Sequence, residues 1–158
     1  MPKKSADQWF AEYGESHQNH TNELIHWICV PVIFFCVVGL VWSIPAPSAW
    51  LERLPWFDWA LPVMVLALLF YVRLSPLLSL GLLAFMSLCY AGVLAIALYA
   101  PWPVWQVCLG LFVLAWIGQF VGHKIEGKKP SFLKDVQFLL IGPAWLLSFI
   151  YKKAGQRY

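Results

Sequence analysis

Long apolar segments separated by short polar or proline-containing turns are the feature that most constrains how this chain folds. They span residues 22–44, 56–74, 76–100 and 102–123. Each is close to the ~20 residues that an α-helix needs to cross the ~30 Å hydrocarbon core of a bilayer. Pro45, Pro76 and Pro101 stand at the boundaries between segments, as expected for a residue that cannot continue a helix. The sequence therefore predicts an all-α integral membrane helical bundle with four long transmembrane helices.

The composition of the chain indicates the same solvent. Hydrophobic residues make up 61% of it and charged residues 12%, which is far from the usage of a soluble globular domain. Several of the ten Trp stand where apolar segments meet polar residues, as in an interfacial aromatic belt. The net charge of +3 is modest, and no Lys/Arg run is interleaved with aromatic residues, so we expect no nucleic-acid partner.

The N-terminal 20 residues are more polar than the rest. Ser5-Ala-Asp-Gln8 has the form of a capping box, and Trp9, Tyr13 and His17 follow at four-residue spacing on one helical face. We expect residues 1–20 to form a short amphipathic helix at the membrane surface and a turn. Thr21 or Asn22 is expected to cap the first long helix, in which Pro31 marks a kink.

A fifth apolar segment covers residues 136–151 and has Gly142-Pro143 at its middle. Because proline lacks an N–H donor, we expect these two residues to interrupt the helix. The segment is then a tilted span, a broken re-entrant helix or an interfacial helix, and the sequence does not decide among them. The whole chain, residues 1–158, is predicted to form a single transmembrane domain.

Topology predicts that the two ends of the four-helix region share one face. Four crossings separate Asn22 from His123, and an even number of crossings returns the chain to its starting side. An excess of Lys and Arg marks the cytoplasmic side of membrane proteins. The shared face holds Lys3, Lys4, Arg73, Lys124, Lys128, Lys129 and Lys134. The opposite face holds Arg53 and, if the last segment crosses, Lys152, Lys153 and Arg157.

All four histidines lie in these two regions, at positions 17, 20, 26 and 123. Imidazole is a common ligand of iron, zinc and copper, and a metal site needs several such groups to converge. On one continuous helix His17 and His26 would point in nearly opposite directions, so the chain must break between them. Gln18-Asn19-His20 supplies that break. His20 itself is either a further ligand or a solvated turn residue.

Two other polar residues share helical faces with these histidines. Asn22 lies four residues before His26 and is expected to orient the imidazole or a substrate. Glu126 lies three residues after His123 and is expected to ligate a metal, to hold an imidazole N–H or to pair with a lysine. A carboxylate with two histidines would suit a non-haem iron(II) oxygenase. The alternative is a non-enzymatic membrane scaffold or lipid-binding protein whose histidines are interfacial polar residues.

Two motifs carry a family resemblance. The first is Tyr13-x-x-x-His17-x-x-x-x-Asn22-x-x-x-His26-x-x-x-x-Pro31, and the second, after the four apolar segments, is Gly122-His123-x-x-Glu126-x-x-x-Pro130. In this order, and over nearly the whole chain, they resemble the membrane family of the yeast endoplasmic-reticulum 2-hydroxy fatty acid dioxygenase. The resemblance implies Fe(2+)-dependent α-oxidation, in which a 2-hydroxy fatty acid and O₂ give a fatty acid one carbon shorter.

The same resemblance implies that the iron ligands are among His17, His26 and His123, supported by Glu126 and Asn22. The expected partners are membrane lipid, the hydroxy acid and O₂. The compact, Trp-rich form of the chain indicates a bacterial inner membrane, with the histidine site on its cytoplasmic face. The native lipid, its chain length and the oligomeric state are left open by the sequence.

Overall fold

The computed structural model describes residues 4–127 and 132–157, and from residue 138 onward it describes the side chains of the second range. Helices are the only regular secondary structure in this part of the chain, so the all-α prediction is confirmed. The elements are α1 (Ala6–Gly14), α2 (His20–Trp42), α3 (Ser48–Leu51), α4 (Ala60–Leu74), α5 (Pro76–Tyr99), α6 (Val104–Glu126) and α7 (Phe132–Lys153). The residues used above that lie outside the described ranges are Lys3, Lys128, Lys129 and Pro130, together with the side chain of Lys134.

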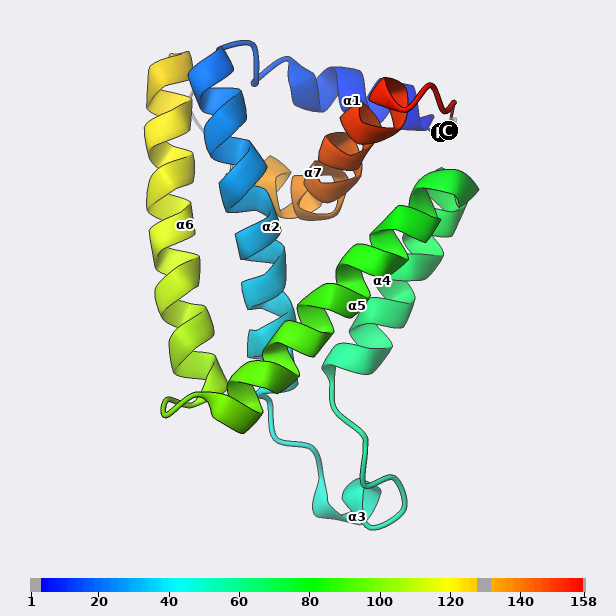
Figure 1. Cartoon of the computed structure of the whole chain (residues 1–158), viewed down its shortest axis with the longest axis vertical. Helices are drawn as coiled ribbons and strands as arrows, with labels where there is room; N and C mark the ends of the chain where they lie inside the picture. Colours follow the sequence, from blue (N-terminus) through cyan, green and yellow to red (C-terminus); the bar gives the residue numbers. More distant parts are fainter. Residues whose placement is uncertain (1–3, 128–131, 158) are drawn as a thin grey trace.

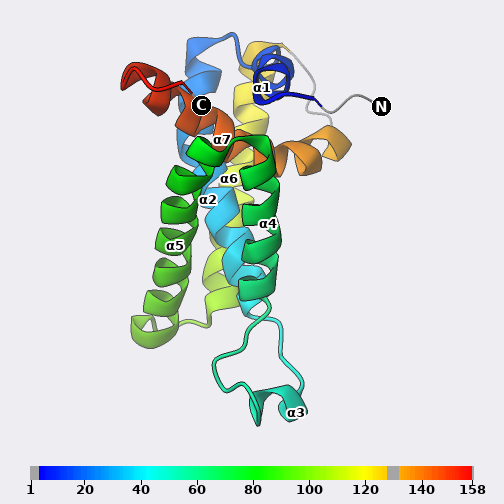
Figure 2. The same ribbon diagram turned by 90° about the vertical axis from the view of Figure 1, so that its right-hand side faces the viewer.

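The chain runs alternately down and up between the two ends of the molecule in α2, α4, α5 and α6 (Figure 1). α2 packs mainly against α6, and α4 packs against α5. α1 and α7 lie at one end of this bundle and α3 lies at the other (Figures 1 and 2). The start of α2 and the end of α6 therefore share one end of the molecule, which is what the even number of apolar segments predicted.

Three of the described helices, α2, α5 and α6, are long and apolar enough to cross a membrane by length and composition. The expectation of four long spans is wrong for residues 56–74. α4 has 15 residues, which is about 22 Å of helix and too short for a ~30 Å core. It begins late because Asp58 Oδ1 accepts hydrogen bonds from the backbone N–H groups of Ala60 and Leu61, at 2.8 and 3.2 Å, and so ends the preceding turn.

Apolar side chains cover the outside of the bundle. Ile28, Leu88 and Leu114, on α2, α5 and α6, are 69%, 72% and 66% exposed. In water such a surface would be an aggregation liability, whereas in lipid it is the expected one. The outward faces therefore agree with membrane association.

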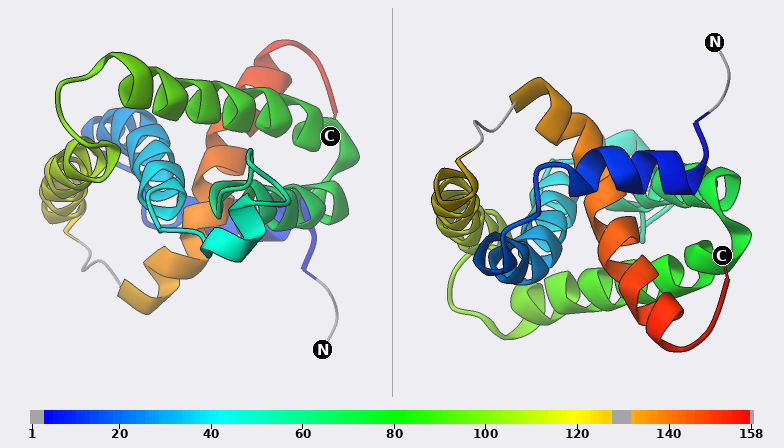
Figure 3. Two further views of the ribbon diagram at one scale, coloured as in Figure 1. Left: turned by 90° about the horizontal axis from the view of Figure 1, so that it is seen from below. Right: turned by 90° about the horizontal axis from the view of Figure 1, so that it is seen from above.

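α7 is one continuous helix through Pro143, so the predicted interruption at Gly142-Pro143 is wrong. Hydrogen bonds between α7 and its neighbours hold it in place: the Tyr71 hydroxyl of α4 donates to the Leu140 carbonyl at 2.9 Å, and the Tyr151 hydroxyl of α7 donates to the Leu77 carbonyl of α5 at 3.1 Å. α7 lies across the bundle beneath α1 rather than along it, and its C-terminus lies at the α1 end (Figures 1 and 3). A glycine at position 142 is explained by close packing against Val30 of α2, and not by a break in α7.

The residues that cap α1 are the predicted ones, whereas the residue that caps α2 is not. Ser5 and Gln8 form the capping box of α1, with both of its hydrogen bonds present. The N-cap of α2 is Asn19 rather than Thr21 or Asn22, because Asn19 Oδ1 accepts from the backbone N–H groups of both of those residues. The Asn22 side chain is thereby left for a contact with α6.

Candidate metal centre

His17 lies in the turn between α1 and α2, three residues after Gly14, the last residue of α1. Its Nδ1 is 2.6 Å from the carbonyl oxygen of Tyr13, four residues earlier, and the Tyr13 ring stacks on the imidazole with 4.3 Å between centroids. A carbonyl can only accept a hydrogen bond, so Nδ1 must carry the proton in this contact. The backbone thus fixes both the ring orientation and the tautomer, and Nε2 is the ring atom that could ligate a metal.

His26 repeats this arrangement on α2. Its Nδ1 is 2.8 Å from the carbonyl oxygen of Asn22, again four residues earlier, and its side chain is only 1% exposed. In metalloproteins, ligating histidines usually donate the second ring N–H to a carbonyl or a carboxylate. Two of the predicted ligands therefore have such a second partner from their own backbone.

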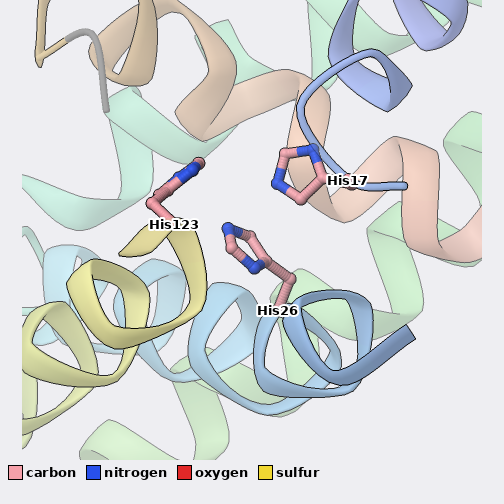
Figure 4. Close-up of side chains that lie close together, drawn as sticks. All are labelled: His17, His26 and His123. Carbon is pink, nitrogen blue, oxygen red and sulfur yellow. The ribbon is translucent and has the colours of Figure 1, made fainter. Parts of the chain in front are cut away.

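His123 comes from the last turns of α6 and meets the other two rings. The ring centroids are 4.1 Å apart for His17 and His26, 5.1 Å for His26 and His123, and 5.6 Å for His17 and His123. All three are buried, and one ligand atom from each lies within 4.8 Å of those of the others. Figure 4 shows the three side chains gathered around a common space from the turn, from α2 and from α6. These residues are called the histidine cluster below.

Small residues on α6 allow this convergence. A Cβ on Gly122 would lie 2.3 Å from Asn22 Oδ1, and a Cβ on Gly118 would lie 2.7 Å from Cys29 Sγ. Gly118 and Gly122 form the small-xxx-small spacing that lets two membrane helices approach closely. α2 and α6 can therefore bring His26 and His123 together only because these two positions carry no side chain.

Glu126 holds the α1–α2 turn against the end of α6. Its Oε1 accepts a hydrogen bond from the Gln18 N–H at 2.9 Å, and its Oε2 accepts from the Asn19 N–H at 2.9 Å and from Asn22 Nδ2 at 3.1 Å. Asn22 Nδ2 also donates to the Ser16 carbonyl at 3.0 Å. The carboxylate thus faces the turn that carries His17, and it is not part of the group of potential metal ligands in the described residues.

The remaining sequence candidates fall on either side of the site. His20 is the first residue of α2, is exposed and lies outside the histidine cluster. Gln119, four residues before His123 on α6, is 7% exposed and lines the cavity at the cluster. Trp145 was not anticipated: its ring centroid is 5.4 Å from that of His17, and the only sequence signal was a tryptophan in a segment of uncertain path.

A small cavity of about 50 Å³ opens at the histidine cluster. Apart from the three imidazoles, Tyr13 and Gln119, its lining is apolar and is made of Val30, Ile33, Trp116, Phe138 and Leu139. The donor set fits a divalent transition metal, because three converging neutral imidazoles suit iron, zinc, copper and nickel alike. A cavity of this size has room for small ligands beside a metal ion, and most of its wall is apolar.

Comparison with known proteins identifies the family of this chain. A family model described as 2-hydroxy-palmitic acid dioxygenase Mpo1-like matches residues 3–154. The chain is 33% identical over 144 residues to the protein of Saccharomyces cerevisiae named 2-hydroxy-palmitic acid dioxygenase MPO1, covering 89% of this chain and 76% of the yeast protein. No solved structure matches. The chain therefore belongs to the Mpo1-like family, as its two histidine motifs indicated.

Proposed function

We propose that this protein is an iron(II)-dependent dioxygenase that converts a membrane-derived 2-hydroxy fatty acid and O₂ to a fatty acid one carbon shorter. The observation that carries the proposal is the histidine cluster: three buried imidazoles from distant parts of the chain, within 4.8 Å of one another, at an apolar cavity. The name of the yeast relative gives the chemical class of the substrate. Because the chain belongs to the same family as this relative, we assign that substrate class to the histidine cluster.

The histidine cluster would hold the metal. Iron is proposed over zinc because the chemistry named for the family consumes O₂, and bound iron(II) supplies the one-electron chemistry that O₂ requires. Three imidazoles leave coordination positions open for other groups. Glu126 and Asn22 act in this proposal as positioning residues, since they fix the turn that carries His17 and the carbonyl that orients His26.

The proposed reaction balances without an external reductant. One 2-hydroxy acid and one O₂ give one acid shorter by a carbon, one CO₂ and one H₂O; the bond between C1 and C2 breaks and C2 becomes the new carboxyl carbon. The site must therefore hold the hydroxy acid and O₂ together and keep water out. Gln119, a buried amide in the cavity lining, is placed to donate a hydrogen bond to the carboxylate of the acid.

We infer that the site faces the cytoplasm. Since α7 lies across the bundle, the basic residues in and after its last turn lie at the same end of the molecule as α1. Among the described residues this end carries Lys4, Arg73, Lys124, Lys152, Lys153 and Arg157, against Arg53 in the connection beside α3. Such an asymmetry is typical of a cytoplasmic side. A bacterial inner membrane stays a prediction, because the relative comes from yeast.

The test is metal content together with turnover. Protein purified in detergent without chelator and reconstituted anaerobically with Fe(II) is expected to retain iron. It should then consume O₂ and 2-hydroxyhexadecanoic acid in equal amounts while forming pentadecanoic acid. Zinc-loaded protein is the matched control and should be inactive. Folded protein that retains no iron would favour the alternative of a non-enzymatic scaffold or lipid-binding protein.

A further inference from the structure

A second, larger cavity lies beside the histidine cluster. Its volume is about 250 Å³, and α2, α4 and α7 enclose it. Every lining side chain is apolar: Phe34, Val37, Val38, Val41, Ala60, Val63, Met64, Ala67, Leu139 and Leu140. On α4 the lining residues fall at i, i+3, i+4 and i+7, which is one helical face, and the two alanines on that face leave the space open. We call this space the tail cavity.

The tail cavity continues the cavity at the histidine cluster. Leu139 lines both, so one side chain of α7 stands between them. On α2, Val30 and Ile33 line the first cavity, and the tail cavity begins with the next residue, Phe34. At about 1.5 Å per residue, its lining from Phe34 to Val41 lies about 12 to 22 Å along α2 from His26. The two spaces therefore adjoin at Leu139, and together they extend from the imidazoles along α2 into the apolar interior.

We propose that the tail cavity binds the acyl chain of the 2-hydroxy acid and sets the chain length that the protein accepts. This inference rests on the proposed function, which places the polar head at the histidine cluster. The head then lies among imidazoles and Gln119, and the chain passes Leu139 and runs along α2 toward the α3 end. A small cavity with a few polar groups, beside a larger and wholly apolar one, suits an amphipathic molecule with a single chain.

Another apolar cavity of the bundle does not adjoin the histidine cluster in this way. It has a volume of about 140 Å³ and is lined by Trp27, Pro31, Leu82, Phe85, Pro143, Leu146, Leu147 and Ile150. None of these residues lines the cavity at the histidine cluster. Trp145, whose ring packs against that of His17, precedes Leu146 on α7 and is buried. An acyl chain in that space would have no direct route to the imidazoles.

The test fills the tail cavity at two depths. α4 runs toward the histidine end, so Ala67 lies nearer the cluster than Ala60 by about 10 Å of helix. Ala60→Phe is expected to lower kcat/KM for 2-hydroxyhexadecanoic acid by about tenfold or more, the scale of a misfit in an apolar pocket, and to leave 2-hydroxyoctanoic acid unchanged. Ala67→Phe should shorten the longest accepted chain further. Ala91→Phe, on the exposed face of α5, is the matched control and should change neither.

Iron content and thermal unfolding of each variant separate a filled cavity from a misfolded protein. Equal losses for the long and the short acid in folded, iron-loaded variants would overturn the proposal, and so would no loss for the long acid. A second measurement does not need turnover: a 2-hydroxy acid with a photoreactive diazirine near its methyl end should label residues 37–41 and 60–64. If the probe labels these residues in a protein that shows no turnover, the proposed reaction is refuted but binding of the acyl chain in the tail cavity is supported. Labelling at Leu82 or Phe85 would overturn the tail cavity alone.

Discussion

Replacing Glu126 with Gln tests whether this residue positions the site or ligates the metal. The two carboxylate oxygens accept three hydrogen bonds, from the N–H groups of Gln18 and Asn19 and from the Asn22 side chain. A glutamine has the same shape but only one acceptor oxygen. Whichever way its amide is oriented, its NH₂ group faces at least one N–H donor, so at least one hydrogen bond is replaced by a repulsive contact.

The size of the effect follows from that count. A hydrogen bond to a charged group contributes about 1.5–3 kcal/mol, and the lower end applies because Glu126 is partly exposed and water can replace a lost partner. About 1.5–2 kcal/mol corresponds to about 10- to 30-fold in an equilibrium constant. If the turn must be ordered for His17 to ligate, iron affinity falls by this factor. The range agrees with the ~10- to 100-fold losses typical of residues that support metal ligands.

The assay is anaerobic competition for Fe(II) against a chelator, with the visible spectrum of the Co(II)-loaded protein as a second readout. We expect weaker binding in Glu126→Gln and, at saturating Co(II), an unchanged spectrum, because the ligand set is intact. Glu23→Gln, the same change in the first turn of α2, is the control and should bind as the wild type does. Unchanged affinity would refute the positioning role. A changed spectrum at saturation would show that the carboxylate is itself a ligand.

Other substitutions test the remaining parts of the site. Alanine in place of any one member of the histidine cluster should remove most bound iron, measured as iron per protein, whereas His20→Ala should retain it. Gly122→Ala places a methyl group 2.3 Å from Asn22 Oδ1 and should cost about 1–3 kcal/mol in thermal unfolding. Gly110→Ala, on the same helix with open space around it, should be neutral or stabilising, and equal effects of the two would refute the close-packing argument. Single cysteines at Thr21 and Lys124, at the α1 end, should react with a membrane-impermeant label from one side of the membrane. A single cysteine at Arg53, near α3, should react from the other side.

The convergence of the histidines could be predicted because it depends on only two properties of the sequence. One is the number of long apolar segments, whose even count returns the chain to its starting end. The other is the break required between His17 and His26, which the polar residues around Asn19 provide. α4 proved shorter than its apolar run, yet it still leads the chain back, so the error in its length did not affect the site.

The length of α4 was misjudged because hydropathy does not distinguish an aromatic turn from a helix. Phe57 and Trp59 count as apolar residues, but their rings pack against Trp50 of α3, at 5.3 and 5.5 Å between centroids. Asp58, between them, caps α4 and accepts a hydrogen bond from the Tyr90 hydroxyl at 2.6 Å. The partners in these contacts, Trp50 and Tyr90, lie outside the segment, and the hydrophobic pattern of residues 56–59 does not indicate them.

The role of Asn22 shows a second limit. Its spacing from His26 correctly indicated contact, and the spacing suggested the side-chain amide as the orienting group. In the structure the backbone carbonyl of Asn22 meets the imidazole, while the amide binds Glu126 and Ser16. Spacing on a helix indicates which residues are near one another, but a residue carries both backbone and side-chain groups. Only the position of α6 decides which of them faces the histidine.

The path of α7 was the largest uncertainty, and its physical cause explains which parts of the site the sequence could reveal. A proline removes one backbone hydrogen bond, a cost that hydrogen bonds from Tyr71 and Tyr151 and close packing of Gly142 on Val30 can offset. Those partners lie on α2, α4 and at the end of α7, so the local sequence 142–143 could not show that the helix continues. The convergence of the three histidines needed only the returning chain and was predicted. The cavity walls need α7 in place, which is why Leu139, on which the path of the acyl chain depends, could be identified only from the structure.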